Sequence, residues 1–256
     1  MTKFKIDKLP NLTKKIHKSQ LKWRDKNWKT SLTNHGKEIE EILEKITVFS
    51  DWVNKLQKSD VAKKLMPEIF IDVFSSIHFA CFGFYKYANM CLRSELETAL
   101  RLIYFSTHPV EFKWWLKENK AFRNMQALAR DVWGQGYVYF EQLEEIKKFE
   151  GSCNKNKKLF AGKANLKRTY EVLSQFIHTG AGHFQTGPEQ FSPHYDKKKF
   201  KYWHLRCKEI QVYINILLIL GFPEDFKAMS SSNKSDILNK CIGANYKDII
   251  RQTLSL

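Results

Sequence analysis

Charged side chains recur at a helical interval in the segment 91–109, which reads CLRSELETALRLIYFSTHP. Arg93, Glu97 and Arg101 follow one another at four-residue steps, so in a helix they form one stripe beside an apolar face. If this stripe faces a cleft, a guanidinium in it can bind a phosphate through two parallel hydrogen bonds. If it faces the core, the same three residues form a partly buried ion network that orients neighbouring helices. The spacing is compatible with both.

A second polar stripe follows in the segment 168–180, RTYEVLSQFIHTG, where Tyr170, Ser174 and His178 repeat at four-residue steps. His178 is expected at the end of its helix, where the helix dipole stabilises an imidazolium and keeps it available as a proton donor. The alternative role for His178 is to cap the last carbonyl groups of the helix. Because both stripes flank apolar residues that must pack inward, we expect them to face each other near the edge of the core.

These two stripes carry a family resemblance. The Arg-Ser-x-x-Glu step in LRSELETALRLIYF and the Tyr-x-x-x-Ser-x-x-x-His step in YEVLSQFIH resemble all-helical prokaryotic proteins of the abortive-infection and HEPN-type families, over about residues 70–178. The resemblance implies an all-helical fold and, in the ribonucleases of the family, an Arg followed after four to six residues by a His, in a helical dimer that cleaves RNA without a metal. Arg101 and His108, separated by LIYFST, have that spacing, whereas His178 has no Arg at the required distance.

The histidines and cysteines do not form a metal-binding pattern. His178, His183, His194 and His204 are too widely spaced for a compact ligand set, and the cysteines contain no Cys-x-x-Cys pair. We therefore expect neither a metal nor another cofactor. The odd number of scattered cysteines is typical of a protein of the reducing cytoplasm. The five cysteines are Cys81, Cys91, Cys153, Cys207 and Cys241.

Positive charge is concentrated at the N-terminus. Of the formal net charge of +16, +9 lies within residues 1–37, where ten lysines and Arg24 face only Asp7 and Asp25. Tryptophans alternate with cations here, an arrangement that can stack bases while neutralising phosphates. The alternative is a solvated basic arm whose tryptophans dock on the rest of the protein. The candidate nucleic-acid-binding residues of this arm are Lys22, Trp23, Arg24, Lys26, Trp28 and Lys29.

Two further basic runs lie outside the arm. One contains Lys157 and Lys158 and continues to Arg168, and the other spans 197–201. Such runs are most often solvated loops. If all three basic segments lie on one face, they form a surface that can follow a phosphate backbone.

Apolar periodicity predicts helices along almost the whole chain. The clearest stripe runs over 37–56, and the segments 68–83 and 84–106 contain the densest apolar runs and are expected at the centre, with Gly83 bending or dividing them. The His108-Pro109 pair is expected to end one helix and start the next. Further helices are predicted at about 110–119, 121–133, 137–149, 165–178, 199–220 and 234–253, the last capped by Ser231 or Ser232.

Composition supports an all-α fold. With 43% hydrophobic residues the chain can bury a core, and eleven Gly and six Pro are few for a protein of many tight turns. We expect one helical domain over 37–256, either HEPN-like as the resemblance implies or an irregular bundle, preceded by a basic arm over 1–36. The most apolar stretch, 69–84, is shorter than the roughly 20 residues of a membrane span and contains Asp72 and His78. We therefore expect no membrane span.

Two functions remain open. The first is a non-catalytic module that binds RNA, DNA or a protein partner through its arm and loops; RNA is expected before DNA, and the resemblance suggests a role in phage defence. The second is a metal-independent HEPN-like ribonuclease, which would form a homodimer and cleave RNA with a His as base and an Arg stabilising the charge on the phosphate. Its candidate catalytic residues are His178, Arg93, Glu97, Ser174, Tyr170, Arg101 and His108.

Overall fold

The computed structural model describes residues 10–118, 144–154, 159, 166–177 and 194–256 of the chain. Within these ranges 89% of the residues are helical and none lies in a strand, which confirms the predicted all-α fold. None of the described helices is both long and apolar enough to cross a membrane. The helices are α1 (Asn11–Lys55), α2 (Asp60–Cys81), α3 (Tyr85–Thr107), α4 (Pro109–Glu118), α6 (Glu144–Ser152), α7 (Leu166–Ile177), α8 (Lys197–Gly221), α9 (Pro223–Lys227), α10 (Ser231–Asp236), η4 (Ile237–Ile242) and α11 (Ala244–Leu254).

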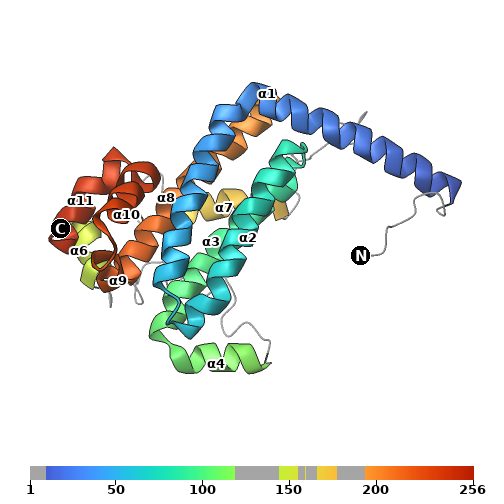
Figure 1. The fold of residues 1–256 in the computed structure, drawn as a ribbon. Coiled ribbons are helices and arrows are strands. Elements are labelled where there is room, and N and C mark those ends of the chain that lie inside the picture. Colours follow the sequence, from blue (N-terminus) through green and yellow to red (C-terminus); the bar gives the residue numbers. More distant parts are fainter. Residues whose placement is uncertain (1–9, 119–143, 155–158, 160–165, 178–193) are drawn as a thin grey trace.

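A hairpin of two long helices, α2 and α3, forms the centre of the fold, as predicted (Figure 1). Gly83 divides the two helices, with φ at +82°. A Cβ at this position would lie 2.6 Å from the carbonyl oxygen of His194, so both the backbone conformation and the close approach require glycine. The next boundary also follows the sequence, because α3 ends at Thr107 and Pro109 starts α4.

The start of α2 lies earlier than predicted. The periodicity predicts a helix from 68, just after Pro67, but α2 begins at Asp60, and the Ser59 side chain accepts a hydrogen bond from the backbone N–H of Ala62. Pro67 lies inside the helix. The first turns of α2 bury Leu65 and Met66, and this burial outweighs the lost backbone hydrogen bond.

The helix α8 crosses the hairpin and buries large apolar side chains along most of its length. One polar junction joins three helices: Ser76 of α2 donates to the carbonyl oxygen of Ala88 in α3 at 2.8 Å and accepts from the Trp203 indole of α8 at 2.8 Å. A second junction joins α8 to α1, where the Trp52 indole donates to Asn215 Oδ1 at 3.2 Å. These buried bonds fix how α8 lies on its neighbours.

The helix α1 is bent at His35, where φ and ψ are −140° and 25°. The predicted border between arm and domain, after residue 36, falls next to this bend. The His35 ring is buried and stacks on Phe200 at 4.2 Å, with Nδ1 3.0 Å from Glu38 Oε1 and Nε2 2.9 Å from Tyr195 Oη. The hydrogen bond to His35 lowers the pKa of Glu38. The bend turns the N-terminal half of α1 past the end of α2, with the first residues of the helix pointing away from the body (Figure 1).

The C-terminal region differs from the single helix predicted over 234–253. Ser230 rather than Ser231 or Ser232 is the N-cap, since its side chain accepts from the backbone N–H of Asn233. The helix then passes through the π-helical turn η4 and stops at Gly243, whose φ is +72°, before α11 starts. A positive φ ends a right-handed helix, so this region forms two short helical segments, one on each side of Gly243, instead of one long helix.

A buried carboxyl group lies between α3 and α8. Glu95 is 1% exposed, its Oε1 accepts from Gln211 Nε2 at 2.6 Å, and its Oε2 is buried without a hydrogen-bond partner among the described residues. Burial raises the pKa of Glu95 well above the usual range of a glutamate, and the nearby Asp72 raises it further. Glu95 therefore binds its proton more tightly in the folded protein than in the unfolded chain.

Glu95→Gln should remove this pH dependence. In the wild type the contribution of Glu95 to stability is present below the unfolded pKa of about 4.3 and is lost as the pH rises towards the raised folded pKa. The glutamine keeps the shape and the bond from Gln211 but does not ionise. Denaturant unfolding at pH 5 and pH 8 should show that the stability of the variant relative to the wild type increases with pH. A difference that stays constant between the two pH values would contradict a raised pKa of Glu95 in the folded protein.

Candidate functional site

The two polar stripes meet, as predicted, at Tyr170. Arg93 Nη2 lies 2.9 Å from Glu97 Oε1 and donates to the Tyr170 hydroxyl at 2.7 Å, and that hydroxyl donates to Glu97 Oε1 at 2.9 Å. The Arg93 guanidinium carbon also lies 4.8 Å from the centroid of the Tyr170 ring, a cation–π distance. The three side chains therefore form one closed network between α3 and α7.

This network is mostly shielded from water. The side chains of Arg93 and Glu97 are 15% and 16% exposed, and Tyr170 is 8% exposed. Burial raises the pKa of Tyr170, and the negative charge of the Glu97 carboxylate raises it further. The hydroxyl therefore keeps its proton and can donate to Glu97. Each charged group faces an opposite charge or a hydrogen-bond donor inside the network. The arrangement is suited to holding two helices together.

The other predicted catalytic residues are placed less favourably for a shared site. Arg101 Nη2 is 3.9 Å from Glu97 Oε2, and Ser174 Oγ donates to the carbonyl oxygen of Tyr170 in its own helix. The His108 ring stacks on Tyr104 at 4.2 Å, and its Nδ1 lies 3.0 Å from the Tyr104 carbonyl oxygen. His178 lies outside the described residues. The structure thus joins Arg93, Glu97, Tyr170 and Arg101, and these contacts do not include Ser174 Oγ or the His108 ring.

The tryptophans of the arm pack on the end of α2 and on its connection to α3. Trp23 places its ring edge on Phe84 with a centroid distance of 5.1 Å, and Trp28 lies 5.7 Å from His78 and 5.3 Å from Phe82. The structure therefore shows the docking that the sequence offered as one alternative. Trp28 is only partly buried, so docking leaves part of its ring accessible.

Polar side chains of α1 fix this docking by capping α2. Asn27 Nδ2 donates to the Phe82 carbonyl oxygen and Ser31 Oγ to the Cys81 carbonyl oxygen, both at 3.0 Å. The last carbonyls of a helix lack partners within the helix, so these two donors satisfy groups that would otherwise need water. Asn27 Oδ1 in turn accepts from the Tyr195 backbone N–H at 3.2 Å, which ties the start of α8 to the same point.

An exposed stripe of lysines runs along α1 on the side away from this docking. Its members follow at three- and four-residue steps over about 21 Å of helix, and Asn27 and Ser31 point to the opposite side. Lys22, Lys26 and Lys29 were predicted, and the same spacing could have added Lys15 and Lys18. We call this surface the lysine stripe: Lys15, Lys18, Lys22, Lys26 and Lys29.

The predicted basic runs are partly brought together. Lys197, Lys198 and Lys201 are exposed in the first turns of α8, just after Tyr195, which contacts α1. Lys157 and Lys158 lie outside the described residues. Two of the three basic segments are therefore neighbours in space, and between residues 10 and 37 eight cations oppose a single carboxylate, a net charge of +7.

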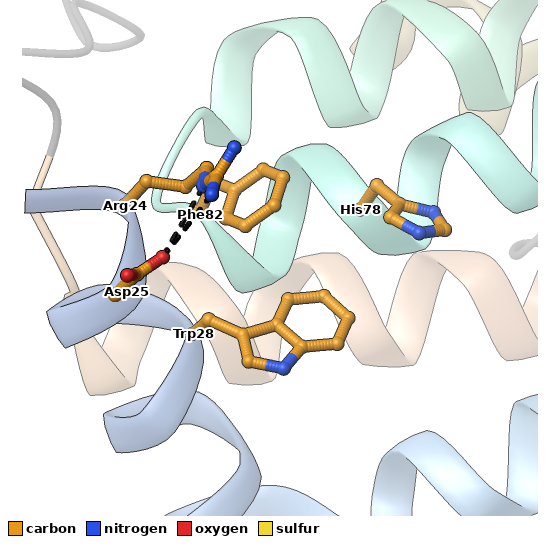
Figure 2. Close-up of a pocket in the computed structure, with 5 residues that line it drawn as sticks. All are labelled: Arg24, Asp25, Trp28, His78 and Phe82. Atoms are coloured by element: carbon orange, nitrogen blue, oxygen red, sulfur yellow. Dashed lines mark hydrogen bonds and ion pairs between the residues drawn. The ribbon is translucent and has the colours of Figure 1, made fainter. Parts of the chain in front are cut away.

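A pocket of about 300 Å³ opens between α1 and the end of α2 (Figure 2). Arg24, Asp25 and Trp28 line it from α1, and His78 and Phe82 line it from the other side. Arg24 and Trp28 were predicted to bind nucleic acid, whereas no sequence pattern pointed to His78, in the last turn of α2, or to Phe82, which follows that helix. His78 and Phe82 line a pocket only because α1 packs beside them.

Comparison with known proteins gives no outside support for an activity. No protein-family model, curated protein or solved structure matches the chain. Among the described residues no group of three or more His, Cys, Asp or Glu side chains could hold a metal ion. The lysine stripe, the pocket and the network of Arg93, Glu97 and Tyr170 are therefore the features of the molecule that bear on its function.

The Arg93 network should respond to substitution as a structural element. Arg93→Ala leaves the shielded Glu97 carboxylate without its main partner and should lower the free energy of unfolding by about 3 kcal/mol. Tyr170→Phe removes one hydroxyl and should cost about 1 kcal/mol. Arg101→Ala, whose side chain is 28% exposed and 3.9 Å from Glu97, serves as the control and should cost under about 1 kcal/mol. An Arg93→Ala variant with wild-type stability in denaturant unfolding would argue against this structural role.

Proposed function

We propose that the protein is a non-catalytic helical module that binds nucleic acid along the lysine stripe of α1. The observation that carries this proposal is a row of exposed cations on a helix held in place by its opposite side. A docked helix loses little conformational freedom on binding, so its charges are already positioned for a phosphate backbone. RNA is the first ligand to test, in line with the family resemblance.

Charge favours a polyanion over other partners. Lys197, Lys198 and Lys201 of α8 add exposed positive charge close to α1, and Asp25 is the one carboxylate between residues 10 and 37. Asp25 itself lies 3.3 Å from Arg24, so its charge is partly neutralised. A surface of this sign attracts phosphates and repels basic proteins.

The contacts of Arg93 favour binding over catalysis. A catalytic guanidinium must be free to meet the charge that develops on a phosphate. Arg93 instead donates to Tyr170 and pairs with Glu97, and all three side chains are largely shielded from water. Incubation of the protein with labelled RNA in EDTA, scoring binding and cleavage separately, distinguishes the module from a HEPN-like ribonuclease.

Neutralising the lysine stripe should weaken nucleic-acid binding and its dependence on salt. Changing Lys15, Lys18, Lys22, Lys26 and Lys29 together to Gln keeps the helix and removes five charges. If all five lysines contact phosphates, the slope of log affinity against log salt should fall by about 3.5 for a single strand. The affinity at 0.1 M salt should then fall on the order of a hundredfold or more. Fluorescence anisotropy of a labelled RNA at several salt concentrations measures both quantities.

A matched variant controls for net charge. Lys58, Lys64, Lys113, Lys117 and Lys147 are also exposed but lie on or beside other helices; α4, which carries two of them, is at the far end of the molecule from the bend of α1 (Figure 1). Their change to Gln removes the same five charges and should have a much smaller effect on affinity. Equal losses in both variants would refute a binding role specific to α1.

A further inference from the structure

The pocket between α1 and the end of α2 has the lining of a site for a flat ring. The Trp28 and His78 rings lie 5.7 Å apart with 25° between their planes, and Phe82 adds a third ring at 5.3 Å from Trp28. The rings come from both sides of the pocket, Trp28 from α1 and the other two from the end of α2 (Figure 2). A volume of about 300 Å³ is at the lower end of the range for pockets that hold small organic groups.

The polar groups at the rim can meet both parts of a nucleotide. His78 Nδ1 lies 2.9 Å from the Phe74 carbonyl oxygen, so in the neutral ring Nδ1–H donates there and Nε2 keeps a lone pair for an N–H group of a ligand. Arg24 is held by Asp25 through an exposed ion pair at 3.3 Å, which contributes little stability. Its guanidinium can therefore leave Asp25 for a phosphate.

An aromatic pocket of this kind accepts either a quaternary ammonium group or a planar base, and the charge around the pocket favours one of them. Aromatic rings bind quaternary ammonium groups as well as planar bases. The surrounding segment 10–37 carries a net charge of +7, which repels an ammonium group and attracts a phosphorylated one. Arg24 and Trp28 lie about 160° and about 125° around α1 from the centre of the lysine stripe, so a strand that places a base in the pocket reaches the stripe by crossing over α1.

We infer that the pocket between α1 and α2 binds an unpaired nucleobase of a single-stranded nucleic acid whose backbone crosses α1 from the pocket to the lysine stripe; this inference rests on the proposed function. Bases in a duplex have their faces covered by their neighbours, so the pocket selects single strands. The pocket thus adds to the proposed function a preference for single strands over duplexes, which charge alone does not provide.

Exposed rings continue from the pocket along α2. Phe74 lies 4.5 Å from His78, and Phe70 stacks on Phe74 with a centroid distance of 6.2 Å and 9° between the planes. Phe70 and Phe74 are 37% and 44% exposed. This row at four-residue steps provides stacking surfaces for bases that follow the one in the pocket.

Two nucleic-acid ligands of equal charge, one with bases and one without, distinguish binding by the pocket from binding by the lysine stripe. The binding of a single-stranded RNA is compared with that of the same sugar–phosphate strand without bases, for the wild type, Trp28→Leu and His78→Leu, each checked for folding by circular dichroism. Stacking of a base predicts that the wild type prefers the base-bearing strand by roughly 5- to 150-fold. Both variants should lose most of this preference and keep their affinity for the strand without bases. Trp114→Leu, which removes a 56% exposed tryptophan from α4, should keep the preference.

The remaining outcomes overturn the inference in distinguishable ways. Equal wild-type affinity for both strands would overturn the base pocket and leave the lysine stripe as the binding surface. Failure to bind either strand would overturn the proposed function together with the pocket. Tight binding of a trimethyl-lysine peptide without a preference for bases would show that the pocket takes cations. If Trp28→Leu does not fold, His78→Leu tests the same preference from the opposite wall.

Discussion

The arrangement of the molecule depends on how the last carbonyls of α2 obtain their hydrogen bonds. A helix leaves its final carbonyl groups without internal partners, and here Asn27 and Ser31 of α1 donate to those of Phe82 and Cys81. The bend at His35 makes this contact geometrically possible, since it directs the N-terminal half of α1 past the end of α2. Both the exposure of the lysine stripe and the pocket at Trp28 follow from this one capping interaction.

The protein separates its two sets of chemistry-bearing residues. Arg93, Glu97 and Tyr170 face each other in a shielded network that joins α3 to α7, whereas the cations of α1 face water. Charged side chains thus serve different purposes in the two places because of their surroundings. A shielded ion network constrains helix geometry, and a row of exposed cations on a fixed helix is free to meet a polyanion.

Local patterns in the sequence predicted those parts of the fold that local physics determines. Apolar periodicity placed α3 and α8 within about two residues, and the His108-Pro109 pair marked the boundary before α4. The four-residue steps also predicted that the two polar stripes face each other, and the structure joins them through Tyr170. Predictions were wrong where long-range packing competes with a local signal, as at Pro67, which α2 incorporates because its first turns bury Leu65 and Met66. The pocket could not be predicted, since His78 and Trp28 are 50 positions apart and meet only through the bend of α1.

The central claim is that the lysine stripe of α1 contacts nucleic acid. It is tested most directly by measuring the reactivity of each lysine towards an amine-acetylating reagent, by mass spectrometry, with and without saturating single-stranded RNA. The account predicts that Lys15, Lys18, Lys22, Lys26 and Lys29 become less reactive when RNA is bound, while Lys113 and Lys117 of α4 react equally in both conditions. Unchanged reactivity along α1 in the presence of bound RNA would contradict the account.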